Sequence, residues 1–371
     1  MYFSLGPQYY YPVYLLLITV LIFGHFIRIY PMGTDKLLKT SKGSWQAILL
    51  TIVLTVFIGL RPVSGRYFGD MGTYAWLFHQ FEDRLADTAY RNDILFMEIM
   101  KLFAENSNVN IFFLFIETLY IVPILLACRR LTKLNNYTLV LFAFSAMSFF
   151  SYGTNGIRNG AATSIFLLAL TFLRGSSKEK IVFLVLSVIA FLIHGSIIVP
   201  IVAAIAAYFI KNPKLMFYFW GAALFLSIFA GGAMASLLSS LGIEQRLSTY
   251  LAGPGNIEDH IARTGFRWDF LLYSSMPIVL GWWVIFKRKI YTRSYALLLG
   301  TYIYANIFWL MVIRAPYSNR FAYLSWFLYP IVLAYPMLVM PVWKKAPGFK
   351  LGIIMVGHLA FTLFMAYKYS F

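Results

Sequence analysis

Charged residues are scarce in this sequence. Asp, Glu, Lys and Arg make up 12% of its 371 residues and 60% are hydrophobic, whereas a soluble domain carries about 25% charged residues. Apolar runs recur along almost the whole chain, with no polar block long enough to fold separately. A soluble fold is therefore excluded, and we predict a single integral membrane domain over residues 1–371.

Cysteine is nearly absent. Cys128 is the only thiol, which excludes an intramolecular disulfide, and no Cys and His residues have the spacing of a zinc site. The net charge of +17 would suggest nucleic acid in a soluble protein, but basic residues in short loops that orient membrane helices explain it better. We expect no nucleic-acid partner and no bound metal.

The apolar runs predict an all-α transmembrane bundle, because a backbone in hydrocarbon must satisfy its own hydrogen bonds. The first run has no basic segment before it and no small-residue cleavage site after it, which favours a retained helix over a signal peptide. Residues 180–211 are too long for one crossing, and His194-Gly195 predicts a break within them. We expect about 12 transmembrane helices, in a range of about 10 to 13, at 11–29, 45–60, 110–128, 137–152, 157–173, 180–194, 196–211, 215–235, 270–286, 294–313, 321–342 and 351–367.

Lysine and arginine predict the orientation of these helices. Every second loop is basic, and the positive-inside rule places the basic loops in the cytoplasm and both termini outside. The basic loops contain Lys36, Lys39, Lys42, Arg129, Arg130, Lys133, Arg174, Lys178, Lys180, Lys211, Lys214, Lys287, Arg288, Lys289, Arg293, Lys344, Lys345 and Lys350.

Two loops on the outer face are long, at about residues 61–109 and 236–269. In the first loop, apolar residues recur with helical spacing from Asp93 to Glu105. This spacing predicts an amphipathic helix over 93–105 that lies at the membrane interface. In the second loop, Gly253-Pro254-Gly255 predicts a turn between two polar helical stretches.

The outer face carries more arginine than topology requires. Lysine would serve topology equally well, whereas the planar guanidinium group grips carboxylate or phosphate oxygens with two parallel hydrogen bonds. We therefore predict an anion-binding face; the alternative is that several of these arginines pair with the acids of the same face, among them Asp70, Glu82, Asp83, Asp87 and Asp93. The outer arginines are Arg61, Arg66, Arg84, Arg91, Arg158, Arg246, Arg263, Arg267, Arg314 and Arg320.

Two outer helix ends combine glycine with a group that could do chemistry. In the segment 155–160, Arg158 stands at a helix start, where free backbone N–H groups attract anions; the alternative is a tight hairpin with a snorkelling arginine. His194 lies at the next outer helix end, with Ser196 two residues on. Histidine readily exchanges protons near neutral pH, but a lone histidine at a helix end is often only a polar interfacial residue.

Three further places carry charge in unusual positions. Arg61, Arg66 and Asp70 follow the second predicted helix, either as two cations around one carboxylate or as an Arg–Asp salt bridge. Arg314 and Arg320 flank the link between two late helices, where either could be merely interfacial. Glu117 lies in the middle of a predicted helix, where a charge costs roughly 3 kcal/mol; it is protonated, paired within the bundle, or part of an ion pathway.

Several short motifs follow one another in a characteristic order. They are Gly59-Leu60-Arg61, Gly69-Asp70 with Tyr74, Gly156-Ile157-Arg158 with Ala161-Ala162, Lys178-Glu179-Lys180, Phe191-Leu192-Ile193-His194-Gly195-Ser196 and Asn319-Arg320. In these motifs the chain resembles the EpsG-like branch of the Wzy-type bacterial polysaccharide polymerases, over roughly residues 45–330. Two departures concern Arg61–Asp70, which is longer than in that pattern, and Asn159, which stands where the pattern has Gln.

The resemblance implies glycosyl transfer at the outer, periplasmic face of the bacterial inner membrane. The donor would be an oligosaccharide repeat unit linked to polyprenyl pyrophosphate, and the acceptor a second lipid-linked repeat unit. O-antigen and exopolysaccharide polymerases of this type need neither a metal nor another cofactor. Membrane lipid, and a chain-length regulator protein, are the partners that the resemblance allows.

We expect preorganised cations to stabilise the departing pyrophosphate. Arg158 and Arg320 are the first candidates, with Arg61 or Arg314 as a third partner and Arg66 as the rival of Arg61. The acceptor hydroxyl needs a base, either His194 or Asp70. Aromatic side chains of the outer loops could stack on sugar rings, although interfacial aromatics are equally expected there: Tyr67, Tyr74 and Trp76.

Two other functions remain open at the level of sequence. A flippase or transporter of lipid-linked glycans would need polar residues along a path through the membrane, and the helix interiors offer few apart from Glu117. A ligase that moves finished polymer to another acceptor shares the donor and the leaving group of a polymerase, so the sequence does not separate the two.

Overall fold

The computed structural model describes residues 5–39, 44–84, 93–132, 134–210, 212–230, 265–315 and 317–369. Every regular element in these ranges is a helix, and none of them is a β-strand. The predicted all-α fold is confirmed. Most of the second outer loop, 236–269, lies outside the described residues, as do Arg91, Arg246 and Arg263.

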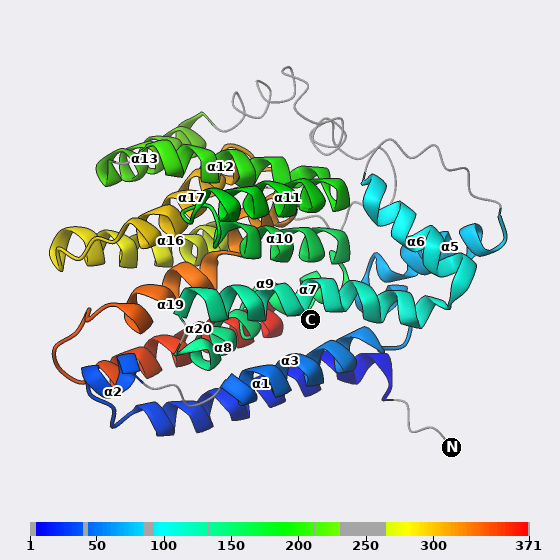
Figure 1. Ribbon diagram of the computed structural model, residues 1–371, viewed down its shortest axis with the longest axis horizontal. Helices are drawn as coiled ribbons and strands as arrows, with labels where there is room; N and C mark the ends of the chain where they lie inside the picture. The colour runs from blue at the N-terminus through cyan, green and yellow to red at the C-terminus, as the bar shows by residue number, and fades with distance from the viewer. Residues whose placement is uncertain are drawn as a thin grey trace. The chain divides into compact units, whose positions relative to one another are not determined.

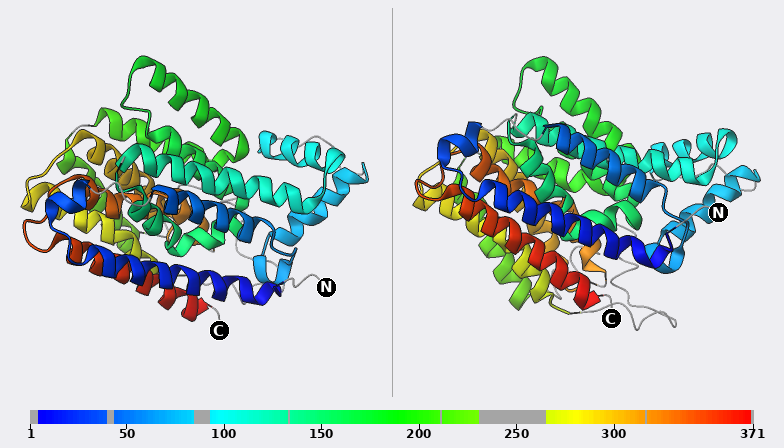
Figure 2. Two further views of the ribbon diagram at one scale, coloured as in Figure 1. Left: turned by 60° about the horizontal axis from the view of Figure 1, so that its bottom comes forward. Right: turned by 90° about the horizontal axis from the view of Figure 1, so that it is seen from below.

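The chain divides into two compact units, of which the first comprises Met1–Ile198 and Ala334–Phe371. Within it α7 packs against α3 and α10, α10 packs against α11, and α1 packs against α20 (Figures 1 and 2). Its helices are α1 (Pro7–Ile29), α2 (Thr34–Lys39), α3 (Ser44–Gly59), α4 (Gly65–Phe68), α5 (Met71–Glu82), α6 (Ile94–Asn106), α7 (Val109–Thr132), α8 (Asn136–Phe144), α9 (Met147–Thr154), α10 (Ile157–Leu170), α11 (Ser177–Ile193), η1 (Gly195–Ile197) and α20 (Pro347–Tyr369).

The second unit is Val199–Leu333. Polar side chains link some of its helices: Asn306 of α17 accepts from Nε1 of Trp220 at 2.9 Å and donates to Ser325 Oγ at 3.2 Å. Such hydrogen bonds between helices suit an apolar surrounding. The helices are α12 (Ile198–Phe209), α13 (Pro213–Phe229), α16 (Trp268–Trp282), the π-helix η2 (Trp283–Lys287), α17 (Arg293–Met311) and α18 (Ser318–Trp326), while α19 (Tyr329–Val339) leads back into the first unit.

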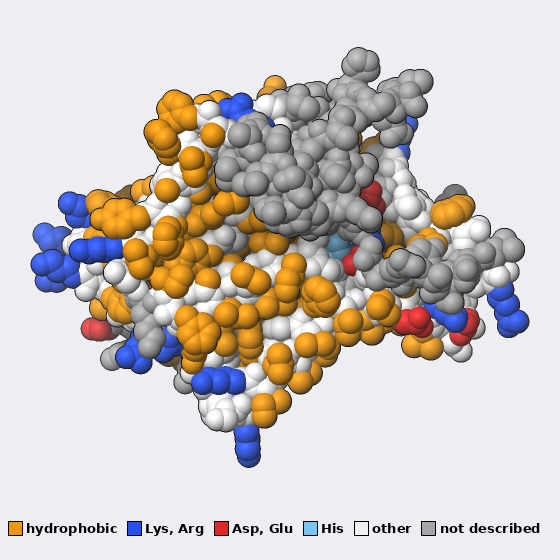
Figure 3. Space-filling view, turned by 90° about the horizontal axis from the view of Figure 1, so that it is seen from above, with side chains coloured by type: hydrophobic (Ala, Val, Ile, Leu, Met, Phe, Trp, Pro, Cys, Tyr) orange, Lys and Arg blue, Asp and Glu red, His pale blue; other side chains and the backbone are white. Residues whose placement is uncertain are grey.

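Several helices have the properties of membrane spans. Among the described residues, six are long and apolar enough to cross a membrane, or seven if the bent pair α8–α9 counts as one span. Four further apolar helices are shorter: Ser44–Gly59, Ile157–Leu170, Gly195–Phe209 and Pro213–Phe229. Hydrophobic side chains cover much of the surface drawn in Figure 3, as contact with lipid requires. The chain is a multi-pass membrane protein, and the number of 12 crossings is not confirmed.

The helix predicted over 137–152 is broken, and this prediction was wrong. Helix α8 ends at Phe144, α9 begins at Met147, and the two are bent by 70°. Ser145 turns its hydroxyl back to the carbonyl of Leu141 at 2.6 Å, and Ala146 is extended with ψ 139. A side-chain hydroxyl that competes for backbone carbonyls in this way favours a bend.

Distant side chains satisfy the carbonyl groups that this break frees. Tyr14 of α1 donates to Phe144 O at 2.5 Å, and Thr362 of α20 donates to Ser145 O at 2.8 Å. Nε2 of His358, also in α20, lies 3.1 Å from Phe142 O. Because lipid offers no hydrogen bonds, these three side chains are what allows an irregular backbone at this depth.

Candidate functional site

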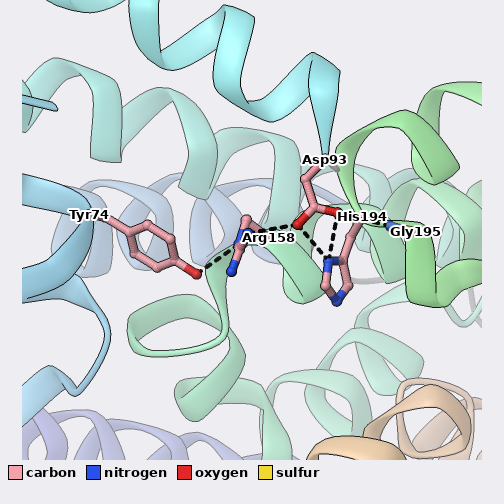
Figure 4. Close-up of polar contacts among 5 residues, drawn as sticks. All are labelled: Tyr74, Asp93, Arg158, His194 and Gly195. Atoms are coloured by element: carbon pink, nitrogen blue, oxygen red, sulfur yellow. Dashed lines mark hydrogen bonds and ion pairs between the residues drawn. The ribbon is translucent and has the colours of Figure 1, made fainter. Parts of the chain in front are cut away.

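Four side chains from separate helices meet at one end of the first unit. They are Tyr74 in α5, Asp93 at the start of α6, Arg158 in the first turn of α10 and His194 at the end of α11, and we call them the Asp93 cluster (Figure 4). The sequence analysis had selected Tyr74, Arg158 and His194. The structure adds the carboxylate that joins two of them.

Asp93 is the centre of this cluster. One carboxylate oxygen accepts from Nη1 of Arg158 at 2.6 Å, and both oxygens lie 3.3 Å from Nδ1 of His194. The backbone N–H of Gly195 donates to the same carboxylate at 3.1 Å. Asp93 is only 6% exposed, so its charge is largely shielded from solvent and interacts strongly with these partners.

The backbone of Asp93 is held in a conformation that few residues adopt. Its φ is 56° and its ψ is 41°, in the left-handed region, and its side chain does not cap the helix that it precedes. A non-glycine residue in this region costs about 1–3 kcal/mol and typically marks a functional site. The carboxylate is thereby turned from its own helix toward α10 and α11.

The partners of Asp93 also control its protonation. Burial would raise the pKa of the carboxyl group, but the hydrogen bond and charge of His194, the charge of Arg158 and the N–H of Gly195 outweigh it and lower the pKa to about 2. Asp93 is therefore a carboxylate at any pH near neutrality.

This charge decides how His194 is held. An ionised carboxylate only accepts hydrogen bonds, so Nδ1 of His194 must carry the hydrogen that points to Asp93. The other ring nitrogen, Nε2, has no hydrogen-bond partner among the residues that the structure describes. In the neutral ring this nitrogen presents a lone pair, which is the arrangement of a general base.

Arg158 is fixed on two sides and open on a third. Its Nε donates to the hydroxyl of Tyr74 at 3.0 Å while Nη1 serves Asp93, and its carbon Cζ lies 5.3 Å from the Tyr74 ring centroid. The side chain is 23% exposed, and within the described part of the chain Nη2 has no hydrogen-bond partner. A guanidinium held in this way can offer the remaining N–H groups to an anion.

Asp70 is connected to the same turn through its backbone. The N–H of Asp70 donates to Oδ1 of Asn155 at 2.8 Å, and its half-buried carboxylate interacts electrostatically with Arg158. Gly69 precedes it with φ +53, and a Cβ there would stand 2.5 Å from Asn155 Oδ1. Glycine is required at this position by both its conformation and the close approach.

Arg61 lies in a different setting, 1% exposed at the end of α3. Its Nη1 donates to Ile58 O at 2.6 Å, its Nη2 donates to Thr154 O at 3.1 Å, and Glu117 Oε2 lies 4.0 Å from Nη1. The guanidinium is thus directed into the first unit rather than toward solvent. Glu117, for which the sequence left three roles open, faces this arginine.

The other predicted residues of the first unit are at its surface. Tyr67 is 47% and Trp76 is 62% exposed, so both rings are accessible to a ligand. Arg66 is exposed, with Cζ 5.6 Å from the ring centroid of Tyr67. Among the described residues, none of the three forms a hydrogen bond, an ion pair or a ring contact with the Asp93 cluster.

Arg314 and Arg320 belong to the second unit. Arg314 donates to the carbonyls of Ser227 and Ile228 at 3.4 and 3.0 Å, and so caps the C-terminus of α13, where carbonyl groups lack helical partners. Arg320 is an exposed residue of α18 whose Cζ lies 5.5 Å from the ring centroid of Tyr317.

Comparison with known proteins gives the family. The family model described as the EpsG family matches residues 44–371. The chain belongs to the EpsG family. This is a family of Wzy-like polysaccharide polymerases and EpsG-type glycosyltransferases, so the resemblance noted in the sequence is confirmed. No curated protein and no solved structure matches the chain.

The residues that the EpsG family model matches, 44–371, include all four members of the Asp93 cluster. The sequence offers Asp93 only as one of several acids that could pair with an outer arginine, as it does with Arg158, and not as a site residue, because an acid at the start of an amphipathic helix suggests a helix cap or a solvated face. Among the described residues, no group of three or more His, Cys, Asp or Glu side chains could hold a metal ion. The groups of the Asp93 cluster that could take part in chemistry are Arg158, His194 and Asp93.

Proposed function

We propose that this EpsG-family protein polymerises oligosaccharide repeat units carried on polyprenyl pyrophosphate, at the periplasmic face of the bacterial inner membrane. The observation that carries the proposal is the Asp93 cluster, where one carboxylate holds a potential base, His194, beside a cation with an open N–H group, Arg158. Base and cation are the two groups that transfer from a pyrophosphate donor needs.

The position of the cluster along its helices supports the periplasmic side. Helix α11 begins beside Lys178 and Lys180 and ends at His194, while α10 begins at Arg158 and is followed by Arg174. The other ends of these helices are tied by Arg130, which donates to Glu179 at 2.7 Å and to Thr171 at 3.1 Å. The basic ends belong in the cytoplasm by the positive-inside rule, so the Asp93 cluster faces the opposite side.

In the proposed reaction, the acceptor hydroxyl attacks the anomeric carbon of the donor sugar. The bond from that carbon to the pyrophosphate oxygen breaks, and the polyprenyl pyrophosphate leaves with the electron pair. Nε2 of His194 takes the proton of the hydroxyl, and Asp93 stabilises the imidazolium that forms, as a carboxylate does for histidine in hydrolase triads. Arg158 binds the oxygens on which negative charge develops.

The other predicted residues have alternative or supporting roles in this proposal. Asp70 is the alternative base, since its backbone is held beside the same turn. Arg66, Arg314 and Arg320 are exposed and could add positive charge toward the pyrophosphate, and Tyr67 and Trp76 could stack on sugar rings. Direct contact of Arg61 with pyrophosphate would require it to leave its buried carbonyl partners, so we give it no such role.

The experiment that tests the proposal is glycan analysis in a strain deleted for this gene. The strain is complemented with the wild type, Arg158→Ala, His194→Ala or the control Arg174→Ala, which changes an exposed arginine just beyond the far end of α10, and equal membrane levels are verified. We expect the wild type and the control to restore a ladder of polymer lengths. The two cluster variants should leave single repeats on the lipid carrier at the periplasmic face.

Two results would contradict the proposal. Accumulation of single lipid-linked repeats on the cytoplasmic side would identify a flippase. Normal polymer that fails to reach its final acceptor would identify a ligase. A separate variant tests the geometry of the cation: Arg158→Lys cannot contact Tyr74 and Asp93 with two different nitrogens, because lysine carries one, and a full ladder in this variant would refute pyrophosphate binding by a planar guanidinium.

A further inference from the structure

The buried pair Arg61 and Glu117 brings a basic and an acidic side chain together with almost no access to solvent. Both side chains are 1% exposed, and Glu117 lies within α7, a helix long and apolar enough to span the membrane. Charges in such a place are costly and usually functional. Nε of Arg61 and Oε1 of Glu117 have no hydrogen-bond partner among the described residues, so the pair is not a fully satisfied structural bridge.

The bonds that Arg61 does make join two helix ends. Ile58 O lies in the last turn of α3, and Thr154 is the last residue of α9. The carbonyl groups at helix C-termini lack intrahelical partners and carry the negative end of the helix dipole, so one buried cation stabilises both ends. Arg61 thereby holds the start of the segment 61–70 against the end of α9.

A second tie lies one residue further along. Asn155, next to Thr154, accepts the N–H of Asp70 at the other end of the same segment. The turn 154–157 is therefore bound at two adjacent residues, by Arg61 and by Asp70, immediately before Arg158. Since a helix start inherits its position from the residues that precede it, these ties fix where the guanidinium of Arg158 lies.

Glycine lets Glu117 reach this arrangement. A Cβ at Gly153 would stand 2.5 Å from Oε1 of Glu117, and a Cβ at Gly59 would stand 3.0 Å from Cα of Leu114 in the same helix. The backbones before Arg61 and before Thr154 thus approach α7 closely enough for one carboxylate to face the guanidinium that links them.

We propose that Arg61 and Glu117 are a positioning pair, which sets the turn before Arg158 and does not touch substrate. Glu117 faces the buried guanidinium and keeps it in place, and the guanidinium holds the ends of α3 and α9. The expected effect of this pair on polymerisation rests on the proposed function. The expected effect of the pair on the turn 154–157 is independent of what the protein polymerises.

The test is a double-mutant cycle on the full-length protein in lipid vesicles, with Arg61→Gln, Glu117→Gln and the double variant. The substrate is the single lipid-linked repeat that accumulates in the deletion strain. We expect each single variant to lower kcat by about tenfold to a hundredfold with KM changed less than about twofold, as a misplaced catalytic group does. The double variant should be no slower than the worse single variant, because both changes break one device.

Direct binding of the donor by Arg61 predicts a different pattern. Arg61→Gln would then raise KM, whereas Glu117→Gln would leave KM unchanged or lower it. Losses of kcat that multiply in the double variant would also contradict the positioning pair. Arg130→Gln is the matched control, since it breaks another arginine–glutamate pair of the same unit that is 38% and 37% exposed. Such surface pairs contribute little, and kcat should stay within about twofold of the wild type.

Hydrogen exchange separates this inference from the proposed function. Amide exchange in residues 154–160 should quicken in Arg61→Gln and Glu117→Gln, but not in Arg130→Gln, while exchange in α1 stays unchanged. If the wild type fails to polymerise and exchange still responds in this way, the proposed function is wrong and the positioning pair stands. If exchange in 154–160 is unchanged in both variants, the positioning pair is wrong whatever the activity.

Discussion

Asp93 and Arg158, which are 65 residues apart in the chain, are joined by a hydrogen bond of 2.6 Å between a carboxylate oxygen and Nη1. The same carboxylate faces His194, which is 101 residues from Asp93. One acid thus places a cation and an imidazole side by side at the ends of α10 and α11. Its removal should affect both at once.

Asp93→Asn is expected to reduce polymerisation by about a hundredfold or more, because the neutral amide neither holds the charge of Arg158 nor stabilises an imidazolium at His194. The measurement is the initial rate of polymer formation at saturating lipid-linked repeat. Glu98→Gln, which changes an exposed acid of the same helix, should stay near the wild-type rate. A rate in Asp93→Asn within about threefold of the wild type would contradict the role of Asp93.

Tyr74→Phe should have a smaller effect, since it removes one hydroxyl and keeps the ring beneath Arg158. A hydrogen bond to a charged group contributes about 1.5–3 kcal/mol, which sets an upper bound of roughly a hundredfold in kcat/KM. We expect the loss to be smaller than that of Asp93→Asn. Tyr74→Ala should lose more than Tyr74→Phe, and equal losses in the two variants would show that the ring makes no contribution.

Gly69→Ala should destabilise the protein and weaken the tie between Asp70 and Asn155. The left-handed backbone at φ +53 and the approach of Asn155 Oδ1 to 2.5 Å from a Cβ act in the same direction, and strain of this kind costs about 1–3 kcal/mol. The measurement is the thermal unfolding midpoint in detergent. Gly24→Ala is the control, since a Cβ at this helical glycine meets nothing within 4 Å and should stabilise slightly.

The charge of Asp93 predicts how stability depends on pH. Its pKa is lowered from 3.8 to about 2 in the folded protein, so its stabilising contribution is complete above the unfolded value and is lost as the pH falls through the folded one. The difference in unfolding midpoint between the wild type and Asp93→Asn should be constant from about pH 5 to 8 and shrink between about pH 4 and 2. A difference that already shrinks between pH 7 and 5 would show that Asp93 is not held as a carboxylate.

The sequence predicted the all-α fold because lipid leaves the backbone few alternatives, while the predicted 12 crossings are not confirmed. It predicted the break after α11 from His194-Gly195, but not the break between α8 and α9. That second break depends on hydroxyl groups of Tyr14 and Thr362, which lie 130 and 217 residues from the carbonyls that they serve. No local sequence pattern indicates partners at such a distance along the chain.

Arg158 and His194, which the sequence selects because they stand at helix ends beside glycine, lie around one carboxylate in the structure, and their roles stay predictions. The sequence offers Asp93 only as one of several acids that could pair with an outer arginine, because its place between Arg158 and His194 depends on a left-handed backbone and on the approach of two other helices. For Arg61 the sequence predicted a pyrophosphate contact on the outer face. In the structure its side chain turns inward to Glu117 and two carbonyl groups. Residue type and position along the chain do not determine that direction.

The break at Ser145 has a consequence for how the protein is made. A ribosome adds residues from the N-terminus, so Phe144 and Tyr14 are both in place long before Thr362 and His358 are synthesised. Until α20 enters the membrane, the carbonyl group of Ser145 has no side-chain donor and that of Phe142 has only Ser145 Oγ, at 3.3 Å, so the α8–α9 corner is incomplete. The turn that follows α9 leads directly to Arg158, so the end of the first unit that carries the Asp93 cluster acquires its final form only when α20 has been inserted.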